Sequence, residues 1–423
     1  MKYFLIVLTF VFSSMYYFPF EFTFLRGINT KHMMFVLGSL CLSWDILCNR
    51  SITFNKELII GSIFALIFSI CGLFSNDLNN TSDYAYTIYL GSMWMWLIAC
   101  YGACCFMKLS HGYISVKLII NYLLAICVFQ CIIALLIDFI PSVKTLIDSF
   151  FVTGEVGYME RINRLYGIGA SLDVAGVRFA CVLVLAAVIL CEDKLIRNNN
   201  NLLIYYIFSF LIIGVIGNMI ARTTTVGLGL GLAYIIFRSG ILSINIKIID
   251  LKLWKILFSS TLFIVIIATY LYYNNPDFYD LIRFAFEGFF NWVETGKWET
   301  DSTEVLKNMW VFPENIKTWI IGDGYFNNPI TGGYYMGTDV GYLRFIFYSG
   351  LIGLFSFSIF FIYLSLALSI RFKYIKYVFF LLLIIVFVNW IKVATDIFLV
   401  YAFFLCISQP YFSPYYKKDF EAI

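Results

Sequence analysis

An acid, a tyrosine and an arginine lie close together where a long polar segment meets an apolar run. Asp339, Tyr342 and Arg344 belong to residues 339–353, which close the polar segment and continue into the apolar run. We therefore expect these side chains where water meets lipid. Asp339 has the chemistry of a general base or of a group that orients a hydroxyl. Capping of the following helix is an equally open role, and Tyr342 fits either a ligand contact or an interfacial anchor.

Arginines recur in the segments that we expect on the same side of the membrane. They are Arg161, Arg164, Arg178, Arg222 and Arg344. Arginine opposes the usual charge bias on the outer side, and ionisable groups inside a bilayer are costly and usually functional. A planar guanidinium binds two phosphate oxygens at once. The set therefore predicts a phosphate or diphosphate ligand, although any single arginine could instead reach lipid head groups or pair with an aspartate.

Other catalytic groups are sparse in this sequence. The only two histidines, His32 and His111, lie outside the long polar segments, and the eleven cysteines fall in apolar runs or at their ends. No Ser/His/Asp set, phosphate-binding loop or Cys/His cluster is visible. The cysteines are expected to pack as small apolar side chains. We predict neither a cofactor nor a metal.

The composition excludes a soluble enzyme. Hydrophobic residues make up 61% of the chain, aromatic residues 20% and charged residues only 13%, whereas soluble domains carry about 25% charged residues. The net charge of +3 is small and no basic run is present. A nucleic-acid partner is therefore not expected.

Apolar runs predict an all-α polytopic membrane protein with about twelve transmembrane helices. We expect residues 1–423 to form a single integral membrane domain, in which the first run is an uncleaved span. The polar residues near 389–396 predict that the last run turns and forms two short spans. The runs cover residues 3–18, 32–48, 57–75, 84–107, 116–137, 174–191, 202–219, 223–237, 254–272, 346–370 and 377–410.

Positive charge alternates between the short connections, which predicts that both termini are cytoplasmic. Two long segments then lie outside, at 138–173 and 273–341. Long loops are uncommon unless they carry function, so both are the first places to seek a site. Residues 277–311 are compatible with helices on the outer surface.

Glycine and proline positions bear on transport. All seven prolines fall in loops or at the ends of apolar runs. Transporters often use glycine- or proline-broken helices at their substrate sites, and the absence of such breaks argues modestly against transport. Gly227, Gly229 and Gly231 predict a face for close helix packing inside one span.

With these residues in view, the chain resembles the O-antigen polymerase (Wzy-type) family within the O-antigen ligase/polymerase superfamily. The resemblance covers the whole predicted topology, including the large outer loop late in the chain. Its most specific local part is 339–344. The other parts are Arg164-Leu-Tyr-Gly167, Ala175-Gly-Val-Arg178, Ala221-Arg-Thr223 and Ile321-Gly-Asp-Gly324.

The resemblance implies a glycosyltransferase of the bacterial inner membrane. It would polymerise undecaprenyl-diphosphate-linked oligosaccharide repeat units at the periplasmic face, in contact with membrane lipid and with a chain-length regulator protein as a partner. Asp339 would position or deprotonate the acceptor sugar. The residues implied to hold the diphosphate are Arg178 and Arg222, assisted by Arg161, Arg164 and Arg344, with Tyr342 as a further substrate contact.

Two alternatives stay open. A lipid-linked oligosaccharide flippase would share the partner lipid, but it does not need a large outer loop and should show internal repeats, which are not found. An O-antigen ligase is expected to carry a histidine in that loop, and this chain has none there. The spacing between Arg161 and Gly176 also departs from the Arg-x15-Gly pattern of some polymerases.

Overall fold

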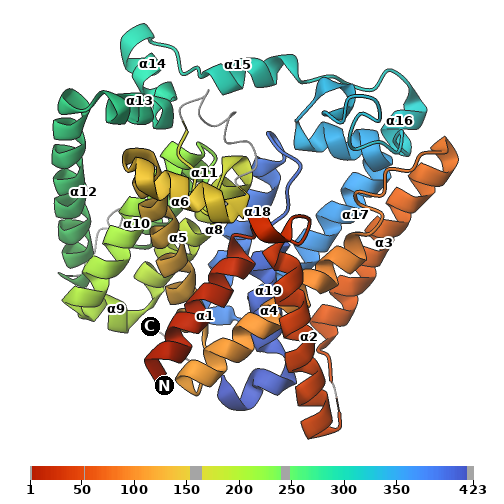
Figure 1. Ribbon diagram of the computed structural model, residues 1–423, viewed down its shortest axis with the longest axis horizontal. Helices are drawn as coiled ribbons and strands as arrows, with labels where there is room; N and C mark the ends of the chain where they lie inside the picture. Colours follow the sequence, from red (N-terminus) through yellow and green to blue (C-terminus); the bar gives the residue numbers. More distant parts are fainter. Residues whose placement is uncertain (1, 52, 153–163, 240–247, 417–423) are drawn as a thin grey trace.

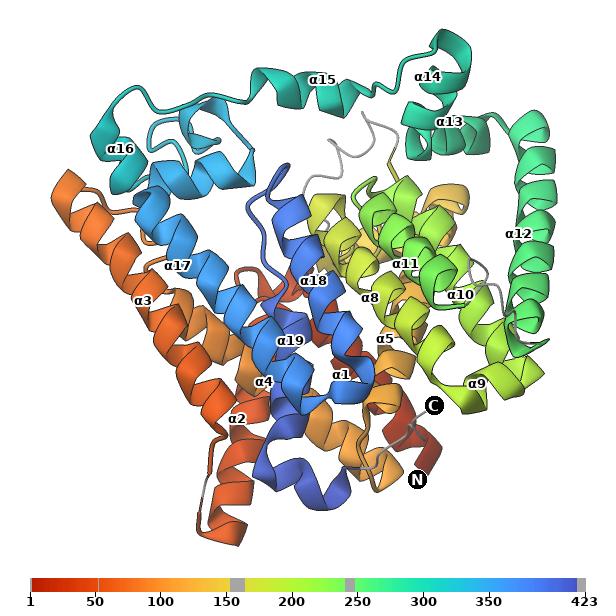
Figure 2. The same cartoon turned by 180° about the vertical axis from the view of Figure 1, so that it is seen from behind.

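The computed structural model describes residues 2–51, 53–152, 164–239 and 248–416. The chain folds into a bundle of apolar helices with a group of shorter helices across one end (Figures 1 and 2). Eight helices are long and apolar enough to cross a membrane. The prediction of a helical membrane protein is confirmed to the extent of these eight helices. The count of twelve transmembrane helices stays a prediction.

Each predicted apolar run coincides with a helix, and the last run contains two. The eight long helices are α2 (Thr30–Asn49), α3 (Lys56–Asn79), α4 (Tyr89–His111), α5 (Val116–Phe139), α8 (Leu172–Glu192), α10 (Asn200–Ile220), α12 (Ile248–Asn274) and α17 (Gly341–Arg371). The shorter ones are α1 (Lys2–Tyr17), α11 (Thr224–Arg238), α18 (Lys376–Asn389) and α19 (Phe398–Ser408).

The core of the bundle surrounds α8, whose residues from Ala175 to Cys191 are almost all buried. Helices α5, α10, α11 and α18 pack on α8, while α2 packs on α4 and α3 on α17. The core also holds α19, which packs on α4. By contrast, α12 is almost entirely exposed and lies at the edge of the bundle, where its apolar surface suits contact with lipid (Figure 1).

Four short helices, α13 to α16, extend across the end of the bundle opposite the first turn of α1 (Figures 1 and 2). The helices predicted within 277–311 are therefore confirmed, and the side of the membrane on which they lie stays a prediction. Their bounds are α13 (Pro276–Ala285), α14 (Glu287–Thr295), α15 (Asp301–Asn308) and α16 (Ile316–Ile320). The remaining short elements are β1 (Glu21–Phe22), η1 (Thr23–Leu25), α6 (Pro141–Phe150), β2 (Phe151–Val152), α9 (Lys194–Asn198), η2 (Tyr335–Gly337), η3 (Lys373–Ile375) and η4 (Pro410–Tyr415), with β1 antiparallel to β2.

Helix α17 is broken near its first end. Gly350 has φ 65° and ψ −173°, which is not helical. A Cβ atom at this position would lie 2.1 Å from the carbonyl oxygen of Ile320, so only glycine fits. The prediction that no span contains a break is therefore wrong for this helix.

The break frees backbone carbonyl groups, which the turn at 321–324 binds. The amide of Asp323 donates to the carbonyl of Phe347 at 2.6 Å, and that of Gly324 donates to Tyr348 at 3.2 Å. Gly322 has φ +87°, and a Cβ there would lie 2.6 Å from the Tyr348 carbonyl oxygen. The glycines of Ile321-Gly-Asp-Gly324 thus let two backbones meet and fix the start of α17.

Helix α11 approaches α8 through two of its glycines. A Cβ at Gly227 would lie 2.2 Å from the Cα atom of Ala180 on α8, and one at Gly231 would lie 3.3 Å from the Cβ atom of Ala187 on α8 and 2.9 Å from the ring of Phe210 on α10. Nothing lies within 4 Å of the corresponding position at Gly229. The predicted face for close packing is confirmed for the first two glycines and not for Gly229.

Gly227→Ala and Gly229→Ala form a matched pair within one helix. The added methyl group at 227 overlaps the α8 backbone, and overpacking of this kind costs about 1–3 kcal/mol. At 229 the methyl group meets open space and raises helix propensity, which stabilises by about 0.4–1 kcal/mol. Thermal unfolding of the detergent-purified variants should show a lower Tm only for Gly227→Ala. Equal shifts for the two variants would contradict the close contact with α8.

Candidate functional site

Asp173, in the first turn of α8, joins three segments of chain at the end of the bundle that α13 to α15 cover. Its carboxylate accepts a hydrogen bond from Lys392 Nζ at 2.7 Å, and also one from the Thr223 hydroxyl. Lys392 belongs to the connection between α18 and α19, and Thr223 to that between α10 and α11. The ion pair therefore fixes the ends of five helices around one point.

Small and strained residues allow these segments to meet. A Cβ at Gly176 would lie 2.9 Å from the Cβ atoms of both Ala221 and Thr223, so glycine lets the connection rest directly on α8. Leu172, immediately before Asp173, has φ 53°. This conformation is rare for a residue with a Cβ and costs of the order of 1–3 kcal/mol. Such strain is typical of functional sites, where the surrounding structure maintains it.

Arg164 and Arg222 lie against the same aromatic ring. Their guanidinium carbons are 4.8 Å and 4.5 Å from the centre of Phe284, on α13. Burial, and next the charge of Arg164, lowers the pKa of Arg222 to about 10, so this side chain stays charged at neutral pH. Two like charges this close are stabilised by negative neighbours, and the carboxylates of Asp301 and Asp173 lie near enough to oppose the fall in the pKa of Arg222.

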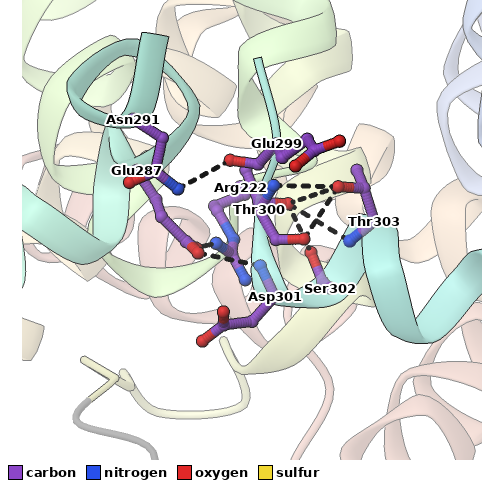
Figure 3. A network of polar contacts seen from close by, with 8 residues as sticks. All are labelled: Arg222, Glu287, Asn291, Glu299, Thr300, Asp301, Ser302 and Thr303. Atoms are coloured by element: carbon purple, nitrogen blue, oxygen red, sulfur yellow. Dashed lines mark hydrogen bonds and ion pairs between the residues drawn. The ribbon is translucent and has the colours of Figure 1, made fainter. Parts of the chain in front are cut away.

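A carboxylate of the covering helices contacts Arg222 directly. Arg222 and Glu287 form an ion pair in which both side chains stay partly exposed, at 14% and 18%. The other oxygen of Glu287 accepts a hydrogen bond from the amide of Asp301 at 2.8 Å. A capping box formed by Thr300 and Thr303 then begins α15. Figure 3 shows how this network joins α14 and the start of α15 to the arginine.

Asp339 faces Arg344 across the start of α17. The Arg344 Nη1 to Asp339 Oδ1 distance is 3.4 Å. The helix begins after Val340 and has no side-chain cap, so the alternative role of Asp339 as a helix cap is not observed. Arg344 also donates from Nη2 to the Phe326 carbonyl at 3.1 Å and to Asn327 Oδ1 at 3.0 Å. Because both terminal nitrogens, Nη1 and Nη2, are engaged by the protein, Arg344 positions the loop and Asp339, while its Nε is buried without a partner within the described residues.

The environment of Asp339 favours its neutral form more than water does. Burial raises the pKa of Asp339 to about 6, with the nearby charge of Arg344 opposing this rise and that of Asp173 adding to it. Burial also raises the pKa of Tyr334, beside this carboxylate, to about 12. A carboxylate with a pKa near 6 is still ionised at neutral pH and is a stronger base than an exposed aspartate.

Arg178 lies one turn further into α8 and belongs to a second charged group. It interacts electrostatically with Asp396 of the α18–α19 connection, as does Lys31 at the start of α2. Within the described residues, no hydrogen bond is found for the guanidinium of Arg178, while its carbonyl oxygen accepts from the Tyr17 hydroxyl at 2.9 Å. Its Nε is buried without a partner. The guanidinium therefore has donors free for a ligand.

The predicted site residues separate into three cases. Arg164, Arg222, Asp339 and Arg344 gather around the Asp173–Lys392 pair, with Arg178 deeper in α8. Tyr342 points toward α18, where its hydroxyl donates to the Phe387 carbonyl at 2.9 Å and its ring meets Trp390 at 5.8 Å. Tyr342 thus supports helix packing in this structure. Arg161 lies outside the described residues.

Five participants were not predicted as site residues: Asp173, Phe284, Glu287, Lys392 and Asp396. Lys392 and Asp396 carried a visible signal, because they interrupt an otherwise apolar run. From the sequence, that signal predicts only a turn between two spans. The turn is confirmed at 390–397, between α18 and α19. Glu287 and Phe284 had no such signal within a long segment rich in acids and aromatic rings.

Cysteines form the one group of metal-ligand type found in the described part of the chain. The Sγ atoms of Cys100, Cys104 and Cys406 lie within 4.8 Å of one another, and all three side chains are buried. They lie in the apolar core between α4 and α19. A metal would require buried thiolate charges there, which is costly without nearby cations. Their arrangement agrees with the predicted role of packing.

Comparisons with known proteins do not identify a family. No protein-family model, curated protein or solved structure matches the chain. The chemistry is therefore argued from the cluster itself. Arg164 and Arg178 have few partners for their guanidinium groups among the described residues, and an ionised carboxylate of raised pKa lies in the same cluster. This arrangement suits an anionic ligand whose neighbouring group is a hydroxyl or another weak acid.

Arg222→Gln should weaken the binding of inorganic pyrophosphate by about 10- to 100-fold, because charge-assisted hydrogen bonds contribute about 1.5–3 kcal/mol. Glu287→Gln should instead strengthen binding, by up to about fivefold, since the competing carboxylate is lost and such partly exposed pairs contribute at most about 1 kcal/mol. Isothermal titration of the purified protein measures both effects. Arg238→Gln is the control, because Arg238 pairs with Glu192 at the other end of α11. If Arg222→Gln and Glu287→Gln change the affinity for pyrophosphate in the same direction, Glu287 does not compete with the ligand for Arg222.

Proposed function

We propose that the protein polymerises undecaprenyl-diphosphate-linked oligosaccharide repeat units into O-antigen or a related surface polysaccharide. One observation supports this most. Arg164 and Arg222 lie at the end of a membrane bundle together with Asp339, beneath helices that can cover a ligand. The resemblance to the O-antigen polymerase family, carried in part by the same residues, is a second support. The proposed reaction needs no cofactor.

In the proposed reaction, an acceptor sugar hydroxyl attacks the anomeric carbon of the growing chain. The bond between that carbon and the diphosphate oxygen breaks, and undecaprenyl diphosphate leaves with the bonding electron pair. Arg222 and Arg164 stabilise the negative charge that develops on the leaving group. Asp339 accepts the hydroxyl proton. Arg178, with free donors, extends the diphosphate site, and Arg344 keeps Asp339 in place.

The proposal includes a membrane arrangement. Twelve helices would cross the bacterial inner membrane, with both termini in the cytoplasm and residues 273–341 in the periplasm. The ends of α8, α11 and α17 that carry the charged cluster would then face the periplasm, where lipid-linked units are joined. A chain-length regulator protein is the expected partner in that membrane.

The two alternatives predict different products from the same site. A flippase would move lipid-linked units without forming a glycosidic bond, and the glycine break in α17 removes the sequence argument against transport. This break lies near one end of the helix rather than at its middle, so it does not by itself favour a transport path. A ligase would transfer finished polymer to an acceptor lipid, and the large loop of this chain lacks a histidine.

Deletion of the gene should leave single repeat units on the lipid core and abolish the polysaccharide ladder on a gel. Wild type should restore the ladder. Arg222→Ala should lower the rate of polymer formation by about 100-fold or more, as expected for loss of one preorganised charge-stabilising group. Arg238→Ala serves as the matched control, and immunoblots of membranes establish equal amounts of protein. Accumulation of lipid-linked units inside the cell would support the flippase, and polymer left on its carrier would support the ligase.

The rate of chain extension should depend on the ionisation of Asp339. Because its pKa is raised to about 6, the basic form predominates at pH 7 and is lost as the pH falls through 6. The rate in membrane vesicles with supplied lipid-linked units should fall accordingly, by about tenfold for each further unit of pH.

Arg344→Gln tests the direction in which the midpoint of the pH profile moves. Loss of this cation removes a charge that lowers the pKa of Asp339, so the midpoint of the pH profile should move upward. Asp339→Asn should lose most activity together with the pH dependence. A midpoint that stays at the same pH in Arg344→Gln would contradict the role of Asp339 as the titrating base.

A further inference from the structure

A cavity of about 600 Å³ lies at the other end of the bundle from the arginine cluster. It is bounded by the second half of α2, the face of α4 that begins at Trp94, the connection between α2 and α3, and η4. These elements lie at the end opposite α13 to α16 (Figure 2). None of the residues of the proposed reaction lines this cavity, so a ligand here has a role separate from that reaction.

The lining changes character along the length of the cavity. Trp94 and Ile98 line its apolar part on α4, facing Leu42 of α2, whereas Lys108 of α4 and Asp45 of α2 line its polar part. The stretch of α4 from Trp94 to Lys108 rises by about 21 Å at 1.5 Å per residue. One leaflet of a bilayer contributes about 15 Å of hydrocarbon. The cavity is thus long enough for an acyl chain together with a head group.

The polar part holds one positive and one negative charge that do not pair directly. Asp45 accepts hydrogen bonds from the hydroxyls of Tyr101 and Tyr411, the latter at 2.8 Å. Lys108 donates to the Tyr411 hydroxyl and lies 4.0 Å from the centre of the Tyr415 ring. Within the described residues, neither charge forms a salt bridge. A tyrosine hydroxyl therefore separates an ammonium group from a carboxylate.

We propose that this cavity binds a zwitterionic phospholipid with a primary ammonium group, of the phosphatidylethanolamine type. Its phosphate lies at Lys108, and its ammonium group lies at Asp45 and the face of Tyr101. One acyl chain follows Trp94, Ile98 and Leu42 toward the middle of the membrane.

The charges select this head group over others. A purely anionic lipid gains the contact with Lys108 but brings its charge close to Asp45, which is unfavourable. A choline head group matches both charges, but its quaternary ammonium has no N–H to donate to the carboxylate. A head group with both a phosphate and N–H donors satisfies both sides of the cavity at once.

Native mass spectrometry of the detergent-purified full chain tests the selectivity. Dioleoyl phosphatidylethanolamine should bind about tenfold more tightly than dioleoyl phosphatidylglycerol or phosphatidylcholine. Asp45→Asn removes the negative charge and keeps an oxygen that accepts from the tyrosines. This variant should reverse the order and prefer phosphatidylglycerol, since Lys108 is then the remaining charge. Lys108→Gln should weaken binding of all three phospholipids.

Asp280→Asn is the control, because Asp280 is an exposed acid on α13 at the opposite end of the molecule. Its lipid preference should equal that of the wild type. A reversed preference in Asp45→Asn cannot arise from loss of folding, which would lower all affinities together. Equal affinities for the three lipids in the wild type, or an unchanged order in Asp45→Asn, would overturn the proposal. An anionic preference in the wild type would likewise overturn it.

Discussion

The ion pair between Asp173 and Lys392 is the constraint around which the charged end of this molecule is built. A bundle of apolar helices can accept charge at its ends only where each charge has a partner or meets water. Asp173 satisfies Lys392 and the Thr223 hydroxyl together, and these partners come from connections distant in sequence. Gly176 makes the approach of one connection possible. Arg222, next to Thr223, is therefore placed in part by a contact that it does not itself make.

The helices were predictable because the bilayer imposes a length and an apolar composition on each one, and every apolar run formed a helix. Several residues of the candidate site were predictable because they are charged, in contrast to the apolar runs around them. Arg222 and Asp339 are charged groups next to apolar segments, where chance placement is costly. Lys392 and Glu287 required knowledge of which segments meet, and a single sequence does not contain it. The break at Gly350 was likewise hidden, because its cause is the backbone at Ile320, distant in the chain.

The same physical rule gives the two ends of the bundle different chemistry. At one end, Arg164 and Arg222 share a ring, and Glu287 pairs with Arg222 within the described residues, so this end suits an anion that can replace that carboxylate. At the other, Asp45 and Lys108 balance each other across Tyr411, so the end suits a neutral molecule with separated charges. Both are arrangements of charge beside apolar surface. What distinguishes them is the balance of charge.

Under the proposed function, the contact between Arg222 and Glu287 would link the binding of the diphosphate to the position of the covering helices. A partly buried guanidinium needs a negative partner, and in the described structure Glu287 supplies it from the start of α14. A diphosphate brings more charge and more acceptor oxygens than one carboxylate, so it would displace Glu287 from Arg222. The same carboxylate also holds the amide of Asp301 at the start of α15. Displacement would therefore release or shift the segment between α14 and α15, and the proposed ligand would then set the position of the covering helices.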